Sequence, residues 1–136
     1  MSFDREFRAL VLLLGSGASC ICGSALGHHS FSAEFSRDLP VEVTGTVVNV
    51  EWTNPHARFY LEAPDADGNT VTWDFELTTP NLLMRRGWTR DSLKPGDAVT
   101  VTGWRARNHP HVANASSVVL SNGRRLFTGS AETAAQ

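Results

Sequence analysis

The side chains best suited to chemistry in this sequence are histidines, and two of them, His28 and His29, are adjacent. If the chain is cut before His28, the new α-amine and the His28 ring become neighbouring nitrogen ligands, a combination that suits Cu(II). His56 would add another imidazole if the amino-terminal arm folds back onto the domain. The sequence therefore gives His28, His29 and His56 as a candidate copper site, with a flexible polar terminus as the alternative.

The sharpest local motif is the run Glu-Trp-Thr-Asn-Pro-His at residues 51–56. Its Asn-Pro pair is typical of a turn, so an architectural role is sufficient: Trp52 packs in the core and His56 bonds across to Glu76. In the alternative, functional interpretation, His56 and Glu76 form a polar pair beside an aromatic groove. We favour the architectural role and keep Trp52, Asn54, His56 and Glu76 as candidate ligand-binding residues.

Tryptophans outside the core would be further candidate ligand contacts, because aromatic platforms bind bases or sugars on OB-type domains. Trp73 lies on the apolar phase of its strand and is expected in the core. Trp104 has the phase opposite to Val99 and Val101, and Trp88 follows a helix stop. We therefore predict that Trp88 and Trp104 are the surface candidates.

Familiar catalytic motifs are missing from the sequence, which has no Gly-x-Ser-x-Gly, no phosphate-binding glycine loop and no His-Glu-x-x-His. Its two cysteines, Cys20 and Cys22, lie in the leading apolar stretch. His109 and His111 flank a proline in a polar loop and are expected to be solvated. We predict a protein that is not an enzyme, with an enzyme or enzyme subunit of unknown activity as an alternative.

Composition indicates one ordinary globular domain. The chain has 136 residues, of which 41% are hydrophobic and 19% are charged. Its formal net charge is −2, so no basic field would draw it to nucleic acid.

The segments within residues 1–27 follow one another in the order that is typical of a signal peptide. An uncharged stretch at 9–27 begins with an aliphatic block and ends in small residues before a cut at His28. An uncleaved anchor, or a lipoprotein acylated at Cys20 or Cys22, is the alternative. We expect a periplasmic or secreted protein without stable membrane insertion after processing.

The rest of the chain is divided into a polar arm at 28–39, a β-domain at 40–129 and a tail at 130–136 that is expected to be disordered. The first strand is predicted from Val41 to Trp52. Its apolar face changes phase over residues 45–48, which requires a bulge or bend because side chains alternate along a regular strand.

Two more strands, at 56–62 and 70–77, are predicted to form a hairpin through the Asp-Ala-Asp-Gly turn at 65–68. Alternation places apolar side chains inward, namely Ala57, Phe59, Leu61, Val71, Trp73, Phe75 and Leu77. Like-facing residues must lie opposite one another across the hairpin. This predicts Arg58 opposite Asp74, and His56 opposite Glu76.

A short helix should begin after Thr79 and end at Gly87, with Pro80 in its first turn. Further strands are predicted at 98–106 and 112–120, and a last turn leads into 124–128. Three strands, a helix and two strands are the order of a mainly β, OB-like five-stranded barrel, with a small β-sandwich as the alternative.

Four motifs resemble a family of small exported bacterial proteins, a domain of unknown function. They are His-His-Ser-Phe at 28–31, Glu-Trp-Thr-Asn-Pro-His at 51–56, Thr-Pro-Asn at 79–81 and the run from Arg85 to Asp97. The resemblance implies export and a compact β-fold, and it implies no reaction. Family members tend to continue after the histidine with an aliphatic or small residue and tryptophan, where this chain has Ala57 and Arg58.

The sequence thus predicts an exported, non-enzymatic binding or accessory module for an unknown small ligand or protein partner. A periplasmic protein that binds Cu(II) through its amino-terminal histidine is the first alternative.

Overall fold

The computed structural model describes residues 31–129. The predicted signal peptide, the copper candidates His28 and His29 and the tail at 130–136 lie outside these residues. The described elements, in chain order, are α1 (Phe31–Glu34), β1 (Phe35–Glu51), β2 (Arg58–Pro64), β3 (Thr70–Glu76), α2 (Pro80–Arg85), β4 (Ala98–Ala106), β5 (Val112–Leu120) and β6 (Arg125–Phe127).

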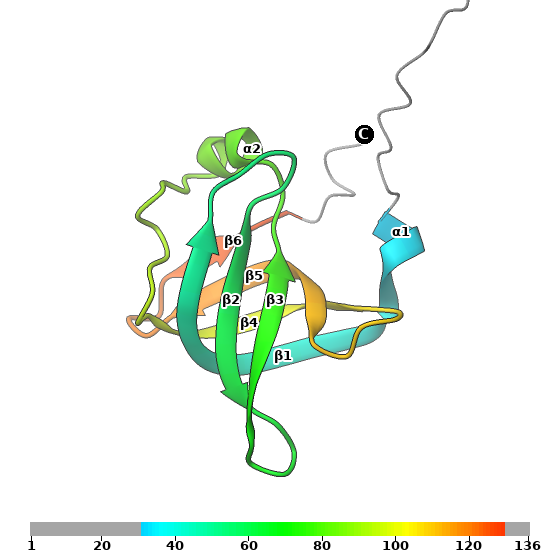
Figure 1. Cartoon of the computed structure of the whole chain (residues 1–136). Coiled ribbons are helices and arrows are strands. Elements are labelled where there is room, and N and C mark those ends of the chain that lie inside the picture. Colours follow the sequence, from blue (N-terminus) through cyan, green and yellow to red (C-terminus); the bar gives the residue numbers. More distant parts are fainter. Residues whose placement is uncertain (1–30, 130–136) are drawn as a thin grey trace, which may run out of the picture.

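The strands form one sheet that curls round until β3 meets β5. Their hydrogen-bonded order is β3-β2-β1-β4-β5-β6, and a short parallel pairing of β3 with β5 closes the first five of these into a ring. Figure 1 shows this ring with α2 at one end and the β2–β3 hairpin at the other. The mainly β fold is confirmed, and the ring is compatible with the expected OB-like arrangement.

The first strand serves two neighbours because it bends. Its first part pairs with β4 as far as Thr46, and its second part pairs with β2 as far as Glu51. The pairing with β2 shifts between Val47 and Asn49, which confirms the predicted bulge. Gly45 lies where a Cβ would run into the carbonyl oxygen of Glu62, so the close strand approach there requires glycine.

This strand begins at Phe35, earlier than the predicted Val41, and Phe35 pairs with Ala106. Part of the expected polar arm is therefore sheet. The reason is apolar burial: Phe35 is 2% exposed and its ring lies 5.5 Å from that of Phe31 in α1.

The predicted register of the β2–β3 hairpin is wrong, although its two side-chain contacts form. Arg58 lies opposite Glu76, and Tyr60 lies opposite Asp74. The loop sets this register, because Asp65 and Asn69 are joined by a backbone hydrogen bond and enclose a short turn that ends in Gly68 at φ +84°.

The α2 helix begins as predicted. The Thr79 hydroxyl accepts a hydrogen bond from the backbone N–H of Leu82, and Pro80 occupies the first turn. Gly87 follows with φ +86° and reverses the chain. None of the helices within residues 31–129 is long and apolar enough to cross a membrane.

The core fills the ring from the end nearer α2. Its members come from all six strands, from α2 and from the loops that flank α2, and they include Val47, Phe59, Leu61, Phe75, Leu77, Leu83, Trp88, Val101 and Val118. Trp88 is 2% exposed, which corrects its prediction as a surface residue. Its indole Nε1 donates to the carbonyl oxygen of Phe127, 2.9 Å away, so it fixes the loop after α2 to β6.

Candidate ligand-binding site

A pocket of about 760 Å³ opens at the end of the ring away from α2. Five inward-pointing side chains line it: Val41, Val43, Val71, Trp73 and Arg105. The β2–β3 hairpin and the loop before β5 complete its rim with Asp65 and His111. Its volume is in the range of pockets that hold small organic ligands.

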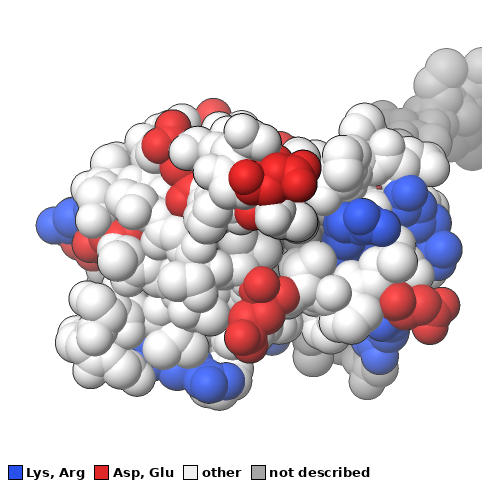
Figure 2. Space-filling view, turned by 90° about the horizontal axis from the view of Figure 1, so that it is seen from below, with Lys and Arg blue, Asp and Glu red and all other residues white. Residues whose placement is uncertain are grey.

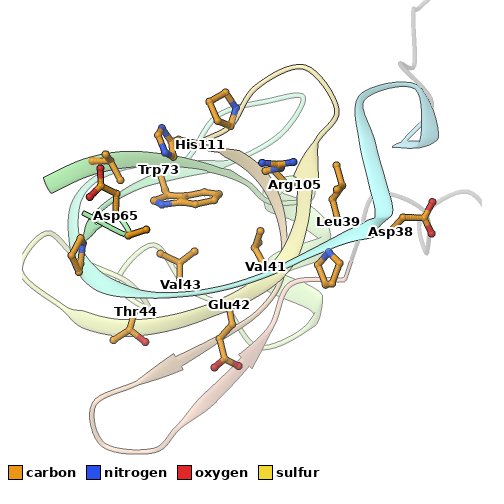
Figure 3. A pocket seen from close by; sticks show the side chains of 15 residues that line it. Asp38, Leu39, Val41, Glu42, Val43, Thr44, Asp65, Trp73, Arg105 and His111 are labelled. Carbon is orange, nitrogen blue, oxygen red and sulfur yellow. The ribbon is translucent and has the colours of Figure 1, made fainter. Parts of the chain in front are cut away.

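Strand phase explains why these side chains meet. Val41 and Val43 are two residues apart in β1, so their side chains point to the same face of the sheet. In β4, Arg105 lies on the same face as Val99 and Val101, whose side chains point inward. Figure 3 shows Trp73, Val43 and Arg105 pointing into the ring. The same strands therefore contribute inward side chains to the closed core at one end of the ring and to the open pocket at the other.

The pocket has an aromatic floor that the core holds in place. Trp73 stacks on Phe75, with ring centroids 5.7 Å apart and planes at 17°. Phe75 stacks on Phe59 with a centroid distance of 5.2 Å. His111 meets the indole of Trp73 edge-on at 5.3 Å, and the carbonyl oxygen of His111 accepts from the Asp74 N–H. The indole therefore presents a rigid apolar surface to the pocket.

Arg105 is the one lysine or arginine in the pocket lining. Its half-buried guanidinium makes no ion pair or hydrogen bond within the part of the chain that the structure describes. Asp65 is already engaged, because backbone N–H groups of Asn69 and Asp67 donate to its carboxylate. These bonds, the one from Asn69 above all, hold the pKa of Asp65 below its ordinary value.

A second polar cluster lies on the outer face of the β2–β3 hairpin. Arg58 binds both oxygens of Asp74, at 2.9 and 2.8 Å, and its other nitrogen binds Glu76 Oε2 at 2.8 Å. Glu76 Oε1 accepts from His56 Nδ1 at 2.9 Å. The predicted contacts of Arg58 with Asp74 and of His56 with Glu76 are therefore present, as diagonal contacts.

Burial governs the electrostatics of this cluster. The Glu76 side chain is 7% exposed, and this desolvation raises its pKa above the ordinary value, although the charges of His56 and Arg58 act against it. The nearby carboxylate of Glu34 raises the pKa further. For Arg58, desolvation would lower the pKa, but the bonds and charge of Asp74 outweigh it, so its pKa is raised.

The other predicted ligand residues are dispersed. Trp52 is half-buried against the core and lines a separate groove with Val50 and Leu93. Asn54 is exposed in the turn before β2 and lines neither pocket. Trp104 lies on the outer face, as its phase predicts, but Phe31 meets it edge-on at 5.8 Å. The guanidinium of Arg37 also lies over its ring.

Metal ligands are not gathered in residues 31–129, where no group of three or more His, Cys, Asp or Glu side chains is placed to hold an ion. His56 is accessible, with 31% of its side chain exposed. Its Nδ1 is bonded to Glu76, which leaves Nε2 as the ring nitrogen available for a further partner. Any site at His56 would need ligands from elsewhere.

The residues that line the main pocket were not among the predicted candidates. Trp73 was assigned to the core, and it is half-buried because its ring lies where the core opens to solvent. His111 was expected to be solvated, yet it packs on Trp73. One feature of the sequence could have indicated this pocket: Arg105 is a charged residue at a position that alternation places on the same face as Val99 and Val101.

Comparisons with known proteins give a family and no activity. No curated protein and no solved structure matches the chain. A family model described as a family of unknown function (DUF6152) matches residues 17–114, more than half of the sequence. The match covers all the strands that line the pocket, up to the first residues of β5. The chain therefore belongs to the DUF6152 family of unknown function.

Proposed function

We propose that this protein is an exported, non-enzymatic binding module that holds a small organic ligand in the pocket between Trp73 and Arg105. The observation that carries the proposal is an inward guanidinium that has no hydrogen-bond or ion-pair partner among residues 31–129, in the same pocket as a rigid aromatic floor. The pocket combines apolar side chains with polar and charged ones, and such polar groups can fix the orientation of a bound small molecule.

The distribution of charge supports a small ligand over nucleic acid. Figure 2 shows the face seen from below, where acidic side chains lie across the middle and beside the basic side chains at the left and right. Nucleic-acid-binding domains instead gather lysine and arginine into one patch or stripe.

Two matched substitutions in β1 test the proposal. Val41 lines the pocket, whereas Val48 is 39% exposed and does not. The protein is screened by ligand-observed NMR against a library of small organic acids, bases and neutral aromatic compounds. We expect hits that Val41→Trp abolishes and Val48→Trp leaves intact, with both variants retaining the wild-type unfolding transition. Hits that survive Val41→Trp would contradict a site in this pocket.

A periplasmic copper-binding function is the second candidate. The observation that favours it is the bond between His56 Nδ1 and Glu76, since a carboxylate commonly orients a metal-binding histidine in this way. His56 Nε2 would then join the α-amine and rings of His28 and His29, which precede the described residues. Amine and imidazole nitrogens are ligands that suit Cu(II).

Calorimetric copper titration tests this second candidate on protein whose first residue is verified as His28. A form with one added residue before His28 and a His56→Ala variant are titrated beside it. We expect both changes to weaken binding, and His109→Ala to leave it unchanged. Equal, weak binding by all forms would contradict a copper site.

A further inference from the structure

We infer that the ligand of the pocket is a flat, apolar organic molecule carrying a single carboxylate, an inference that rests on the proposed binding function. It goes further by assigning Arg105 to the carboxylate and Trp73 to the apolar body.

Arg105 differs from the other half-buried arginines of residues 31–129, Arg58 and Arg86, in having no acceptor there. Arg58 binds two carboxylates, and Arg86 donates to the carbonyl oxygen of Thr128 at 2.7 Å. Arg107 donates to the carbonyl oxygen of Ser32. Arg105 is half-buried in the pocket lining and has no such partner among residues 31–129. A partly desolvated guanidinium gains most from a charged acceptor, and its planar fork matches a carboxylate.

The case for a single negative charge comes from the acids around the pocket. Asp38, Glu42 and Asp65 belong to its lining, and Arg105 is the one lysine or arginine in it. Figure 3 shows Glu42 pointing away from the ring, whereas Arg105 points into it. These acidic surroundings repel a dianion more strongly than a monoanion.

The case for a flat body comes from Trp73. Phe75 covers one face of the indole at 5.7 Å, and the ring also lines the pocket beside Val41 and Val71. A planar apolar ligand can stack on this surface while its carboxylate reaches Arg105. Trp73 and Arg105 line the same pocket, and Figure 3 shows both pointing into the ring, which fits a ligand that touches both.

Three probes of one shape test the inference by calorimetry: 2-naphthoate, neutral 2-naphthamide and dianionic 2-naphthyl phosphate. We expect 2-naphthoate to bind about tenfold or more tightly than either of the others. Arg105→Gln should reduce its affinity to that of 2-naphthamide, and Arg105→Lys should reduce it partly because the fork is lost. Arg124→Gln, an exposed arginine near β6, is the matched control and should change nothing.

The outcomes separate this inference from the function on which it rests. Equal affinity for the acid and the amide, unchanged by Arg105→Gln, would overturn the carboxylate and leave the pocket standing. Tightest binding of the phosphate would overturn the single charge. If none of the probes binds while other compounds from the NMR screen do, the inference falls alone. If nothing binds in either experiment, the proposed function falls with it.

Discussion

Arg58 lies directly opposite Glu76 across the β2–β3 ladder, with its Nη2 2.8 Å from Glu76 Oε2. Glu76 is almost fully buried, so its carboxylate depends on this guanidinium and on His56 for compensation. The two strands that position Trp73 are thus joined by an ionic cluster on their outer face.

Removing the guanidinium should destabilise the fold. Arg58→Met leaves Glu76 with His56 as its remaining partner, and we expect the free energy of unfolding to fall by about 2–3 kcal/mol, less than for a fully buried pair because Arg58 is partly solvated. Urea unfolding measures this change. Arg124→Met makes the same replacement at an exposed site and should alter stability by less than about 0.5 kcal/mol. Equal effects of the two changes would contradict the structural role of Arg58.

The raised pKa of Glu76 predicts a specific pH dependence. Because the folded-state pKa lies above the ordinary 4.5, the contribution of Glu76 to stability is complete below that value and is lost as the pH rises through the folded-state pKa. Glu76→Gln lacks this titration, while His56, Arg58 and Glu34 remain around it. The stability of wild type relative to Glu76→Gln should therefore fall as the pH rises from the ordinary 4.5 through the folded-state pKa of Glu76. A relative stability that rises over this interval would mean that the charges of His56 and Arg58 outweigh burial.

Trp88 should behave as a core residue. We expect Trp88→Ala to lower the free energy of unfolding by about 3–5 kcal/mol. Trp88→Phe keeps most of the burial and removes the hydrogen bond to the Phe127 carbonyl, which should cost about 1–2 kcal/mol. Phe127 itself is 62% exposed, so Phe127→Ala is the control and should have a small effect. A Trp88→Ala variant as stable as Phe127→Ala would show that Trp88 is not buried.

Asn114 offers a stabilising substitution. It is fully buried in β5, beside Glu76 in one neighbouring strand and Trp104 in the other, and neither amide atom has a hydrogen-bond partner among residues 31–129. We expect Asn114→Leu to raise the free energy of unfolding by about 1 kcal/mol, because an unsatisfied buried amide is removed. Asn108→Leu, at an exposed position before β5, should give no gain. Thermal and urea unfolding would both have to show a loss for Asn114→Leu to refute this account.

The sequence predicted those parts of the fold that depend on local patterns. Alternation along 70–77 identified a strand with Phe75 and Leu77 inward, and Thr79 with Pro80 identified the start of α2. Each of these signals lies within a few residues of the feature that it predicts. The phase change in the first strand was equally local, and it gave the bulge.

The hairpin register required information that facing patterns lack. Matching inward faces fixes the pairing only to within two residues, because side chains repeat on one face with that period. The backbone geometry of the turn between Asp65 and Asn69 decides between the possible registers. Arg58 therefore lies opposite Glu76 in place of the predicted Asp74.

The candidate site was missed because it depends on contacts between distant segments. Trp88 is buried through β6, some 39 residues later in the chain, and no periodicity in its loop indicates this. Trp73 was correctly assigned to the inward face, but the end of the core along that face depends on how the ring closes. The sequence did show Arg105 as a charged residue at a position where the strand pattern expects an inward apolar side chain. The importance of this residue becomes clear in the structure, where it lines the same pocket as Trp73.

The central claim is that ligands bind beside Trp73, and the four tryptophans of the chain provide a direct test. Each indole N–H gives its own signal in an ¹⁵N-¹H correlation spectrum, with assignments made from single Trp→Phe variants. On titration with the tightest compound from the NMR screen, we predict that the Trp73 signal shifts most and that the buried Trp88 signal stays in place. A titration that moves the Trp52 signal and leaves Trp73 unchanged would contradict the account, because it would locate binding in the other groove.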